Sequence, residues 1–493
     1  MRPLPLRPLS RVLAACIILI ACSPQEGAPG SLASETSDLA AQRERPGAFQ
    51  HRVVVAGAGL AGLTAALDLR DQGWDVIVVE ARDRVGGRVH TLRAPLTAGM
   101  HAELGGESID DDHNAIQDLA QRYGLSLEHR PLDKVATGTA YFHGQRSVIA
   151  DFLADSQGQV AADYASLADA LAELSQGLDP EHPELFADAR ALDRRSLGDF
   201  ITEQQLLPAA TFALRAVNQA GYNADLSEVS LLFAAQQTAA SDGASDDGSE
   251  TMRIAGGNDA LPAAMAADLS ASVRLRSPVT GVQQLPDRVR IKAGAQLIDA
   301  AYLVLAVPMQ PLRQVSFDPP LPHELQAAVR DLKLGPALKV VSEYAHSFWK
   351  DEGLSGLTIS ELPFGIAWSS SDSYESERGL LTQFITGSAA RQLAQLSSAV
   401  RISACLRQLD VVYPEGARQR TGHNATMSWL DERYTGGGYA VYAPGQLTRF
   451  WPAIRQGTAR IRFAGEHTEA LAGFMESAVR SGHRVAKELG KPD

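Results

Sequence analysis

Short apolar runs alternate with an amphipathic stretch at the start of the folded part of the chain. Residues 52–56 are a valine-rich run that predicts a buried β-strand. Leu60, Leu63 and Leu67 then recur at helical spacing, and Gly73 ends the predicted helix. Residues 75–79 predict a second strand. The order strand, helix, strand predicts an α/β fold with parallel strands.

The turn between the first strand and the helix has the spacing G-x-G-x-x-G. Gly57 permits a tight turn, Gly59 lets a pyrophosphate approach the backbone, and Gly62 lets the helix pack closely on the strand. Glu80 lies near the offset expected of an acid that binds a ribose hydroxyl. This context predicts a dinucleotide site at the helix N-terminus, and the alternative is a glycine-rich turn without a ligand. The predicted contact positions are Gly57, Ala58, Gly59, Leu60, Ala61, Gly62 and Glu80.

A second glycine pair and several arginines follow in the sequence EARDRVGGR, which begins at Glu80. This stretch resembles the motif that follows the fingerprint in FAD enzymes of the flavin-containing amine oxidase family, which includes monoamine oxidases, polyamine oxidases and L-amino-acid oxidases. The resemblance implies that Glu80 holds the adenosine ribose and that Arg82 and Arg88 neutralise phosphates, with Ala81 and Gly87 in the same cofactor site. The alternative for the arginines is a solvated surface position.

Further motifs of this family follow in order, so the resemblance covers residues 51–489. They contribute these cofactor positions: Gly105, Gly106 and Glu107 in LGGES, Val279, Trp429 in WLDERYTGGGY, Gly465 and Glu466 in FAGEHT, and Phe474 and Met475 in GFMES. The resemblance implies that Val279 contacts the adenine end, that Glu466 binds the ribitol chain, and that N–H groups near Met475 face flavin N1 and O2. Some members bond the flavin through a cysteine where this chain has Gly438, so we expect non-covalent FAD.

Three positions are predicted to carry the chemistry. Lys339 lies in an apolar strand-like run, where an ammonium group is costly without partners. In the family the matching lysine holds a water against flavin N5, whereas the alternative is a strand-edge lysine in solvent. Tyr439 matches one wall of the family's aromatic cage and Phe474 the other, although Phe474 could equally belong to the core. Glu107 is a candidate for binding a substrate ammonium group, and its alternative is a surface or structural acid.

The resemblance implies oxidation of the C–N bond of a primary or secondary amine to an imine, and then to a carbonyl, with hydride transfer to flavin N5. Reoxidation would use O2, giving H2O2, or another electron acceptor. Snake-venom-type L-amino-acid oxidases have a carboxylate-binding arginine where this chain has Ser108, which favours an amine. Glu107 points to a diamine or polyamine. An L-amino-acid oxidase, a C–C dehydrogenase on the same fold and a non-enzymatic flavin-binding protein remain open alternatives.

Two domains are expected. The resemblance implies an FAD-binding Rossmann-like domain of the glutathione-reductase type, formed by residues 50–112, 251–330 and 428–493. A discontinuous α+β substrate domain would comprise residues 113–250 and 331–427. Much of the first substrate segment is rich in alanine and leucine at helical spacing.

The N-terminus resembles a bacterial export signal. Arg2, Arg7 and Arg11 precede a short apolar run that ends in Leu-Ile-Ala-Cys at Cys22, which looks like a lipobox. We therefore expect residues 1–22 to be a lipoprotein signal peptide and residues 23–49 to be a flexible tether. The mature protein would be lipid-anchored to a bacterial membrane, on the periplasmic face. An ordinary secretion signal is the alternative.

Charge and cysteine content narrow the partners. A formal net charge of −13 argues against nucleic acid, because nothing would offset phosphate repulsion. The chain has 3 cysteines, and only Cys405 would stay free after processing at Cys22, so no intrachain disulfide is expected. We predict no metal ion, and the sequence leaves the oligomeric state open.

Overall fold

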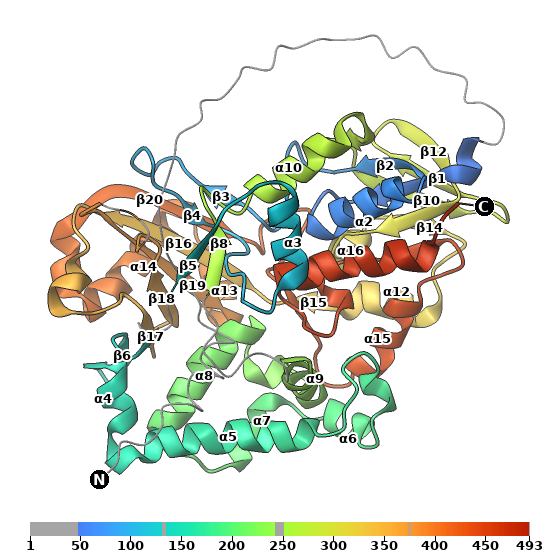
Figure 1. Ribbon diagram of the computed structural model, residues 1–493. Coiled ribbons are helices and arrows are strands. Elements are labelled where there is room, and N and C mark those ends of the chain that lie inside the picture. The colour runs from blue at the N-terminus through green and yellow to red at the C-terminus, as the bar shows by residue number, and fades with distance from the viewer. Residues whose placement is uncertain (1–47, 131–134, 242–250, 373, 375, 493) are drawn as a thin grey trace.

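The computed structural model describes residues 48–130, 135–241, 251–372, 374 and 376–492 (Figure 1). The predicted signal peptide and the tether up to residue 47 lie outside the described residues. Ala48 and Phe49, which we expected in the tether, instead belong to the 3₁₀-helix η1 (Ala48–His51). The Arg288 guanidinium lies 5.3 Å from the centre of the Phe49 ring, so this end of the expected tether packs on the folded body.

The valine-rich runs form the centre of a five-stranded parallel sheet in the order β22-β13-β1-β2-β9. Val53 and Val54 are completely buried on opposite faces of β1. Val53 clusters with helix residues such as Leu63, whereas Val54 clusters with residues such as Ile291 of the four-stranded sheet. Because both faces are covered, the strand is apolar without alternation.

The strands of the two sheets on this side of the molecule have the following bounds. The five-stranded sheet contains β1 (Arg52–Ala56), β2 (Asp75–Val79), β9 (Val273–Arg274), β13 (Tyr302–Leu305) and β22 (Ile461–Phe463). The four-stranded sheet contains β10 (Val279–Gln284), β11 (Val289–Ala293), β12 (Gln296–Ala300) and β14 (Ser316–Asp318), in the order β12-β11-β10-β14. This arrangement confirms the predicted α/β fold with a Rossmann-like unit.

Helices α2 (Leu60–Asp71) and α16 (Met475–Leu489) lie side by side against the parallel sheet, although they come from opposite ends of the chain (Figure 1). A Cβ atom at Gly482 would lie 2.6 Å from the Ala61 carbonyl oxygen. The glycine therefore permits the close approach of the two helices. Helices α3 (Asn114–Arg122), α10 (Ala260–Leu269), α12 (His323–Asp331) and α15 (Leu447–Gln456) complete this half, with the short α11 (Met309–Leu312).

The second half contains a seven-stranded sheet and a group of helices below it in Figure 1. Its strand order is β20-β16-β19-β18-β17-β6-β7, with bounds β6 (Thr139–Phe142), β7 (Gln145–Val148), β16 (Ala337–Tyr344), β17 (Thr358–Ser360), β18 (Ile366–Ser369), β19 (Gly379–Thr386) and β20 (Arg420–Ser428). The helices are α4 (Ile149–Ala154), α5 (Gln159–Ser175), α6 (Ala189–Asp193), α7 (Leu197–Glu203), α8 (Pro208–Tyr222), α9 (Leu231–Ser241), α13 (Gly387–Ala394) and α14 (Ser398–Val412). The exact limits of the two predicted domains stay a prediction.

Three two-stranded ribbons connect the halves: β3 (Thr91–Leu92) with β4 (Ala102–Glu103), β5 (Leu127–Arg130) with β8 (Thr251–Ile254), and β15 (Lys333–Leu334) with β21 (Ala440–Val441). Within the residues that the structure describes, no helix has the length and apolar character needed to cross a membrane.

One segment that is predicted to form a single helix forms two helices in the structure. The pattern from residue 389 to 409 predicts a single helix, but the structure has α13 and α14 with a break at residues 395–397. The Arg401 side chain, which is 5% exposed, donates to the carbonyl oxygens of Leu393, Ala394 and Leu396 at 3.1, 2.8 and 3.2 Å. It therefore satisfies the C-terminal carbonyls of α13, which would otherwise need helical partners.

Candidate active site

The glycine turn between β1 and α2 has a separate physical reason for each glycine. Gly57 has a φ of +107°, and a Cβ atom there would lie 2.5 Å from the Ala306 carbonyl oxygen. A Cβ atom at Gly62 would lie 1.9 Å from the Gly57 carbonyl oxygen. Gly59 differs, because a Cβ atom there would meet no atom closer than 4.0 Å. Gly57 and Gly62 are thus required by the protein itself, and the space at Gly59 faces a cavity.

Glu80 follows β2 and is 3% exposed. Its carboxylate accepts hydrogen bonds from the backbone N–H groups of Ala58 and Arg82 at 2.8 and 2.9 Å. The Arg82 side chain turns to Glu432, with Nε 2.8 Å from Oε2, and lies over the Tyr434 ring. Glu80 is therefore held beside the glycine turn, while Arg82 is already paired with an acid.

Arg88 and Glu466 meet at the centre of the same cavity. Arg88 Nη1 donates to Glu466 Oε1 at 2.6 Å and to the Gly438 carbonyl oxygen at 2.7 Å. Glu466 also accepts from the N–H of Gly473 at 2.9 Å. Burial has the largest single effect and raises the pKa of Glu466, but the charges of Arg88 and His467 and the hydrogen bonds from Arg88 and Ala440 together lower this pKa below its ordinary value.

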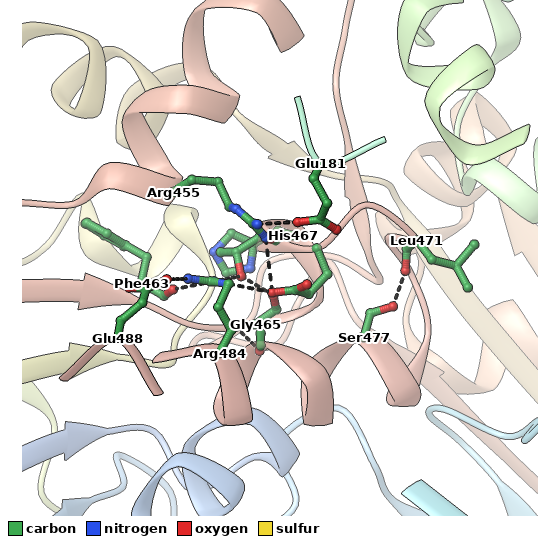
Figure 2. A network of polar contacts seen from close by, with 12 residues as sticks. Glu181, Arg455, Phe463, Gly465, His467, Leu471, Ser477, Arg484 and Glu488 are labelled. Carbon is green, nitrogen blue, oxygen red and sulfur yellow. Dashed lines mark hydrogen bonds and ion pairs between the residues drawn. The ribbon is translucent and has the colours of Figure 1, made fainter. Parts of the chain in front are cut away.

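A polar network around Gly465 and His467, the neighbours of Glu466 in the chain, includes Arg455 and Arg484 (Figure 2). Arg484 donates to the Phe463 carbonyl oxygen at 3.1 Å and to Thr468 Oγ1 at 2.8 Å. Thr468 Oγ1 in turn donates to the Gly465 carbonyl oxygen at 2.8 Å. Arg455 donates to the Thr468 carbonyl oxygen at 2.9 Å and pairs with Glu181. Both ends of the short helix η9 (Glu466–Thr468) are thereby fixed.

Lys339 is buried in β16, with a side chain that is 6% exposed. Its ammonium group donates to the carbonyl oxygens of Glu103 and Gly105 at 2.9 and 3.1 Å, and to Glu107 Oε2 at 2.8 Å. These partners explain how an ammonium group is tolerated inside a sheet. The alternative of a solvent-facing lysine is therefore wrong.

Glu107 contacts groups of the protein in this structure, and its predicted role in binding a substrate ammonium stays a prediction. One carboxylate oxygen of Glu107 binds Lys339, and the other accepts from Trp368 Nε1 at 3.3 Å. The side chain is 7% exposed. Glu107 does line the cavity, but its charge is matched by a lysine of the protein.

The aromatic positions lie at the other side of the cavity. The Tyr439 hydroxyl donates to the Ala220 carbonyl oxygen, and the Tyr439 ring packs against Gly473, next to Phe474. The Phe474 ring contacts the edge of His113, with ring centroids 5.1 Å apart. Trp429 Nε1 donates to the Leu104 carbonyl oxygen at 2.8 Å, which ties the tryptophan to the LGGES segment.

One cavity of about 420 Å³ collects nearly all of the predicted site residues. Its lining includes Gly57, Gly59, Leu60, Ala61, Glu80, Ala81, Arg82, Gly87, Arg88, Gly105, Gly106, Glu107, Val279, Lys339, Trp429, Tyr439, Gly465, Glu466, Phe474 and Met475. Ala58 and Gly62 do not line it, because they serve the Glu80 contact and the helix packing. The glycine-lined walls, the free side of Gly59 and the N-terminus of α2 fit a pyrophosphate-linked cofactor such as FAD.

Several lining residues lack a local signal in the sequence. Trp368 and Phe384 line the cavity from β18 and β19, and Ala220 lines it from α8. A second, outer cavity shares Ala220, Phe384 and Ile366 with the first. Hydrophobic residues in predicted strands and helices cannot be told apart from core residues before the strand register is known.

Asp110 also lines the cavity, and burial together with the charges of Asp112 and Asp111 raises its pKa to about 7. Asp110, Asp112 and His113 lie close enough to hold an ion. However, His113 Nδ1 accepts from the Asp110 N–H at 2.9 Å, so a neutral ring carries its proton on Nε2, the atom that faces the carboxylates. That tautomer does not suit metal binding through Nε2.

Comparisons with known proteins agree with this site. The chain is 27% identical to an L-amino acid dehydrogenase of Synechocystis over 88% of this chain and 94% of that protein. It is 27% identical to amine oxidase B of Homo sapiens over 89% of this chain and 85% of that protein. A putrescine oxidase structure with bound putrescine superimposes with a TM-score of 0.81 at 26% identity, covering 89% and 98% of the two chains. Cyclohexylamine oxidase from Brevibacterium oxydans has the same TM-score of 0.81 at 25% identity.

The family profile described as "Flavin containing amine oxidoreductase" matches residues 60–490, from the start of helix α2 to the end of helix α16. That span contains Glu80, Glu466 and the aromatic residues that the fold brings to one cavity. The chain therefore belongs to the family of flavin-containing amine oxidoreductases, which are FAD-dependent enzymes that oxidise amines.

Proposed function

We propose that this chain oxidises the C–N bond of a primary or secondary amine to an imine, which water then converts to a carbonyl compound. FAD, when bound, supplies the hydride acceptor. The observation that carries this proposal is the convergence of Lys339, Tyr439 and Phe474 on the cavity that also contains the dinucleotide cradle. Tyr439 and Phe474 offer apolar ring surfaces that fit a neutral amine better than a hydrated ammonium ion.

The residues matched to the aromatic cage include no general base that could take a proton from the substrate. We therefore expect the amine to react in its neutral form. The amine must then lose its proton before oxidation, so the rate of cofactor reduction should rise with pH through the substrate pKa. Anaerobic mixing with a panel of monoamines, diamines and amino acids, followed by flavin absorbance, tests the function. If none of them bleaches a flavin that dithionite does reduce, amine oxidation is not the activity.

Substrate choice is narrowed by the Glu107–Lys339 pair. Lys339 Nζ already lies 2.8 Å from the Glu107 carboxylate, so a second ammonium group of a diamine would compete with Lys339 for Glu107. The hypothesis that Glu107 selects a diamine or polyamine substrate thus loses its support. We propose a monoamine as the principal substrate class.

An amino acid is the second candidate, and Arg215 is the observation that favours it. Arg215 is exposed on α8 and lines the outer cavity, which shares the lining residues Ala220 and Phe384 with the inner one. A guanidinium in this outer cavity fits a substrate carboxylate. Arg215→Met should raise KM for amino acids and leave KM for neutral monoamines unchanged.

Non-covalent FAD is part of the proposal. A Cβ atom at Gly438 would lie 2.3 Å from Asn223 Nδ2 and 2.8 Å from the Ala337 Cβ, so the local packing supports glycine rather than a flavin-bonding cysteine. Acid precipitation should release free FAD into the supernatant. Yellow colour that stays with the precipitated protein would contradict this part.

We also propose export and lipid anchoring through Cys22 to the periplasmic face of a bacterial membrane. The support is the sequence alone: the arginine-rich start, the short apolar run and the lipobox-like end. A single acyl chain binds only weakly, so stable anchoring needs more than one. Cys22→Ser should abolish incorporation of labelled palmitate and release the protein from membranes; unchanged labelling would refute the anchor.

A further inference from the structure

The ammonium group of Lys339 has no donor left for a water molecule. A lysine ammonium carries three N–H bonds. The Glu103 carbonyl oxygen, the Gly105 carbonyl oxygen and Glu107 Oε2 lie 2.9, 3.1 and 2.8 Å from Nζ. All three bonds therefore have partners within the protein. The geometry departs from the family arrangement, in which the lysine holds a water.

Two aromatic rings close off this ion pair. Lys339 Nζ lies 5.2 Å from the centre of the Trp368 ring and 5.9 Å from that of Phe384. Lys339 is opposite Phe384 in the β16–β19 register, and Trp368 comes from the next strand, β18. Trp368 also donates to Glu107, so the carboxylate is oriented from both sides. The register of the sheet thus places the two aromatic rings beside the ion pair.

The pair is electrically neutral wherever the shared proton lies, because Lys339 and Glu107 lose and gain the same charge. The neighbouring buried pair Arg253–Glu128, at 3.3 Å, is also balanced. Burial raises the pKa of Glu103 to about 7, so this acid is neutral or negative. Of these groups, Lys339 and Glu107 line the cavity, and their ion pair has no net charge.

A net positive charge matters for the reaction of a reduced flavin with oxygen. Two electrons and two protons pass to O2 to give H2O2, and the first electron produces the superoxide anion. A nearby uncompensated cation stabilises that anion, whereas a neutral ion pair has only a dipole field that falls off faster with distance. An acceptor with a conjugated ring, such as a quinone or an indophenol dye, spreads the charge of the first electron over the ring and therefore depends less on such a cation.

We propose that Glu107 is a positioning residue that holds Lys339 in a neutral pair and so makes O2 a slow electron acceptor for this enzyme, which an electron carrier other than O2 reoxidises faster. This inference rests on the proposed amine oxidation, since the substrate must first reduce the cofactor. Its own test does not need the substrate.

The test uses holoenzyme that is reduced anaerobically with dithionite and then mixed with either O2 or dichlorophenolindophenol, while flavin absorbance is followed. Glu107→Gln leaves Lys339 charged and uncompensated. It should raise the O2 rate by at least about tenfold and leave the dye rate within about threefold. The midpoint potential of the bound FAD, measured by dye equilibration, should move in the positive direction. Glu107→Asp keeps the charge and should behave like the natural protein.

A double variant guards against misfolding. Glu107→Gln with Lys339→Met contains no unpaired buried charge, so it should fold and bind FAD. The proposal expects the O2 rate of the double variant to lie within about threefold of the O2 rate of the natural protein, because neither protein has a net charge at positions 107 and 339. A tenfold fall would show that Lys339 itself promotes the oxygen reaction and would overturn the proposal. An O2 rate in Glu107→Gln that does not rise would also overturn it.

The matched control is Glu352→Gln, which removes an exposed carboxylate that binds Arg146 outside the cavity lining. It should change neither the O2 rate nor the potential. Failure of amines to reduce the flavin would refute amine oxidation without affecting these measurements. The two proposals therefore fail separately.

Discussion

Arg88 and Glu466 are 378 residues apart in the sequence, yet Arg88 Nη1 lies 2.6 Å from Glu466 Oε1. The pair joins the segment after the second strand to the turn before α16. It closes the two ends of the Rossmann-like unit around the cavity, and the network of Figure 2 supports it from behind. Much of the cofactor site depends on this contact.

Replacing Glu466 should therefore weaken FAD binding. Glu466→Gln leaves Arg88 without its ionic partner, and removing one member of a buried pair typically costs about 3–5 kcal/mol. Because Arg88 is 25% exposed and water can solvate it, we expect a smaller effect, a loss of about 10- to 100-fold in FAD affinity, or about 1.4–2.7 kcal/mol. Titrating the apoprotein with FAD and following fluorescence quenching measures it. Glu352→Gln, which removes a carboxylate bound to Arg146 outside the cavity lining, serves as the control, and equal affinities for the two variants would contradict the role of Glu466.

The three fingerprint glycines should separate into two classes. Gly62→Ala would force a Cβ atom to 1.9 Å from the Gly57 carbonyl oxygen, so the protein should lose stability by about 3 kcal/mol or more. Gly59→Ala meets no protein atom closer than 4.0 Å and has an ordinary φ of −81°. Its apoprotein should unfold at nearly the natural temperature, while its FAD affinity falls by at least about tenfold, because the methyl group occupies the phosphate approach. Calorimetry and FAD titration measure the two effects, and a stability loss at Gly59 equal to that at Gly62 would contradict this division.

Tyr439 should act through its ring more than through its hydroxyl. The hydroxyl donates to the Ala220 carbonyl oxygen, and the ring packs on Gly473. Tyr439→Phe removes one hydrogen bond, worth about 1 kcal/mol, so kcat/KM for an amine should fall by about fivefold or less. Tyr439→Leu also removes the aromatic surface and should cost about tenfold more. The rates of anaerobic flavin reduction in the two variants test this prediction. An equal loss of rate in both variants would show that Tyr439 acts through its hydroxyl.

The sequence predicts the cofactor cradle better than it predicts the contacts of Lys339. The glycine turn and Glu80 depend on local spacing, and the structure has them where the spacing indicates. The contact between Lys339 and Glu107 spans 232 residues, and it depends on how the segment after β4 packs against β16. Trp368 lies in β18, and cross-strand register is not encoded in any short motif, so Trp368 could not be identified as the partner of Glu107. The Arg401 contact that ends α13 differs, because it joins a side chain to carbonyl oxygens 5 to 8 residues earlier, and helical periodicity carries no signal for such a cap.

The contact between α2 and α16 should make stability depend on pH. His483 Nδ1 lies 2.5 Å from Asp68 Oδ2, and this hydrogen bond raises the pKa of His483 against the opposing effect of burial. A raised folded-state pKa means that the native state binds the proton more tightly. The stabilisation is therefore complete below the unfolded-state pKa of about 6.5, and it is lost as the pH rises through the folded-state pKa. His483→Gln should lower the melting temperature clearly at about pH 5.5 and much less at about pH 8.5, and high salt should shrink the difference because the side chain is 42% exposed. His51→Gln, at an exposed position, is the control for loss of a histidine. A difference for His483→Gln that grows with pH would reverse the sign of this linkage and refute the assignment.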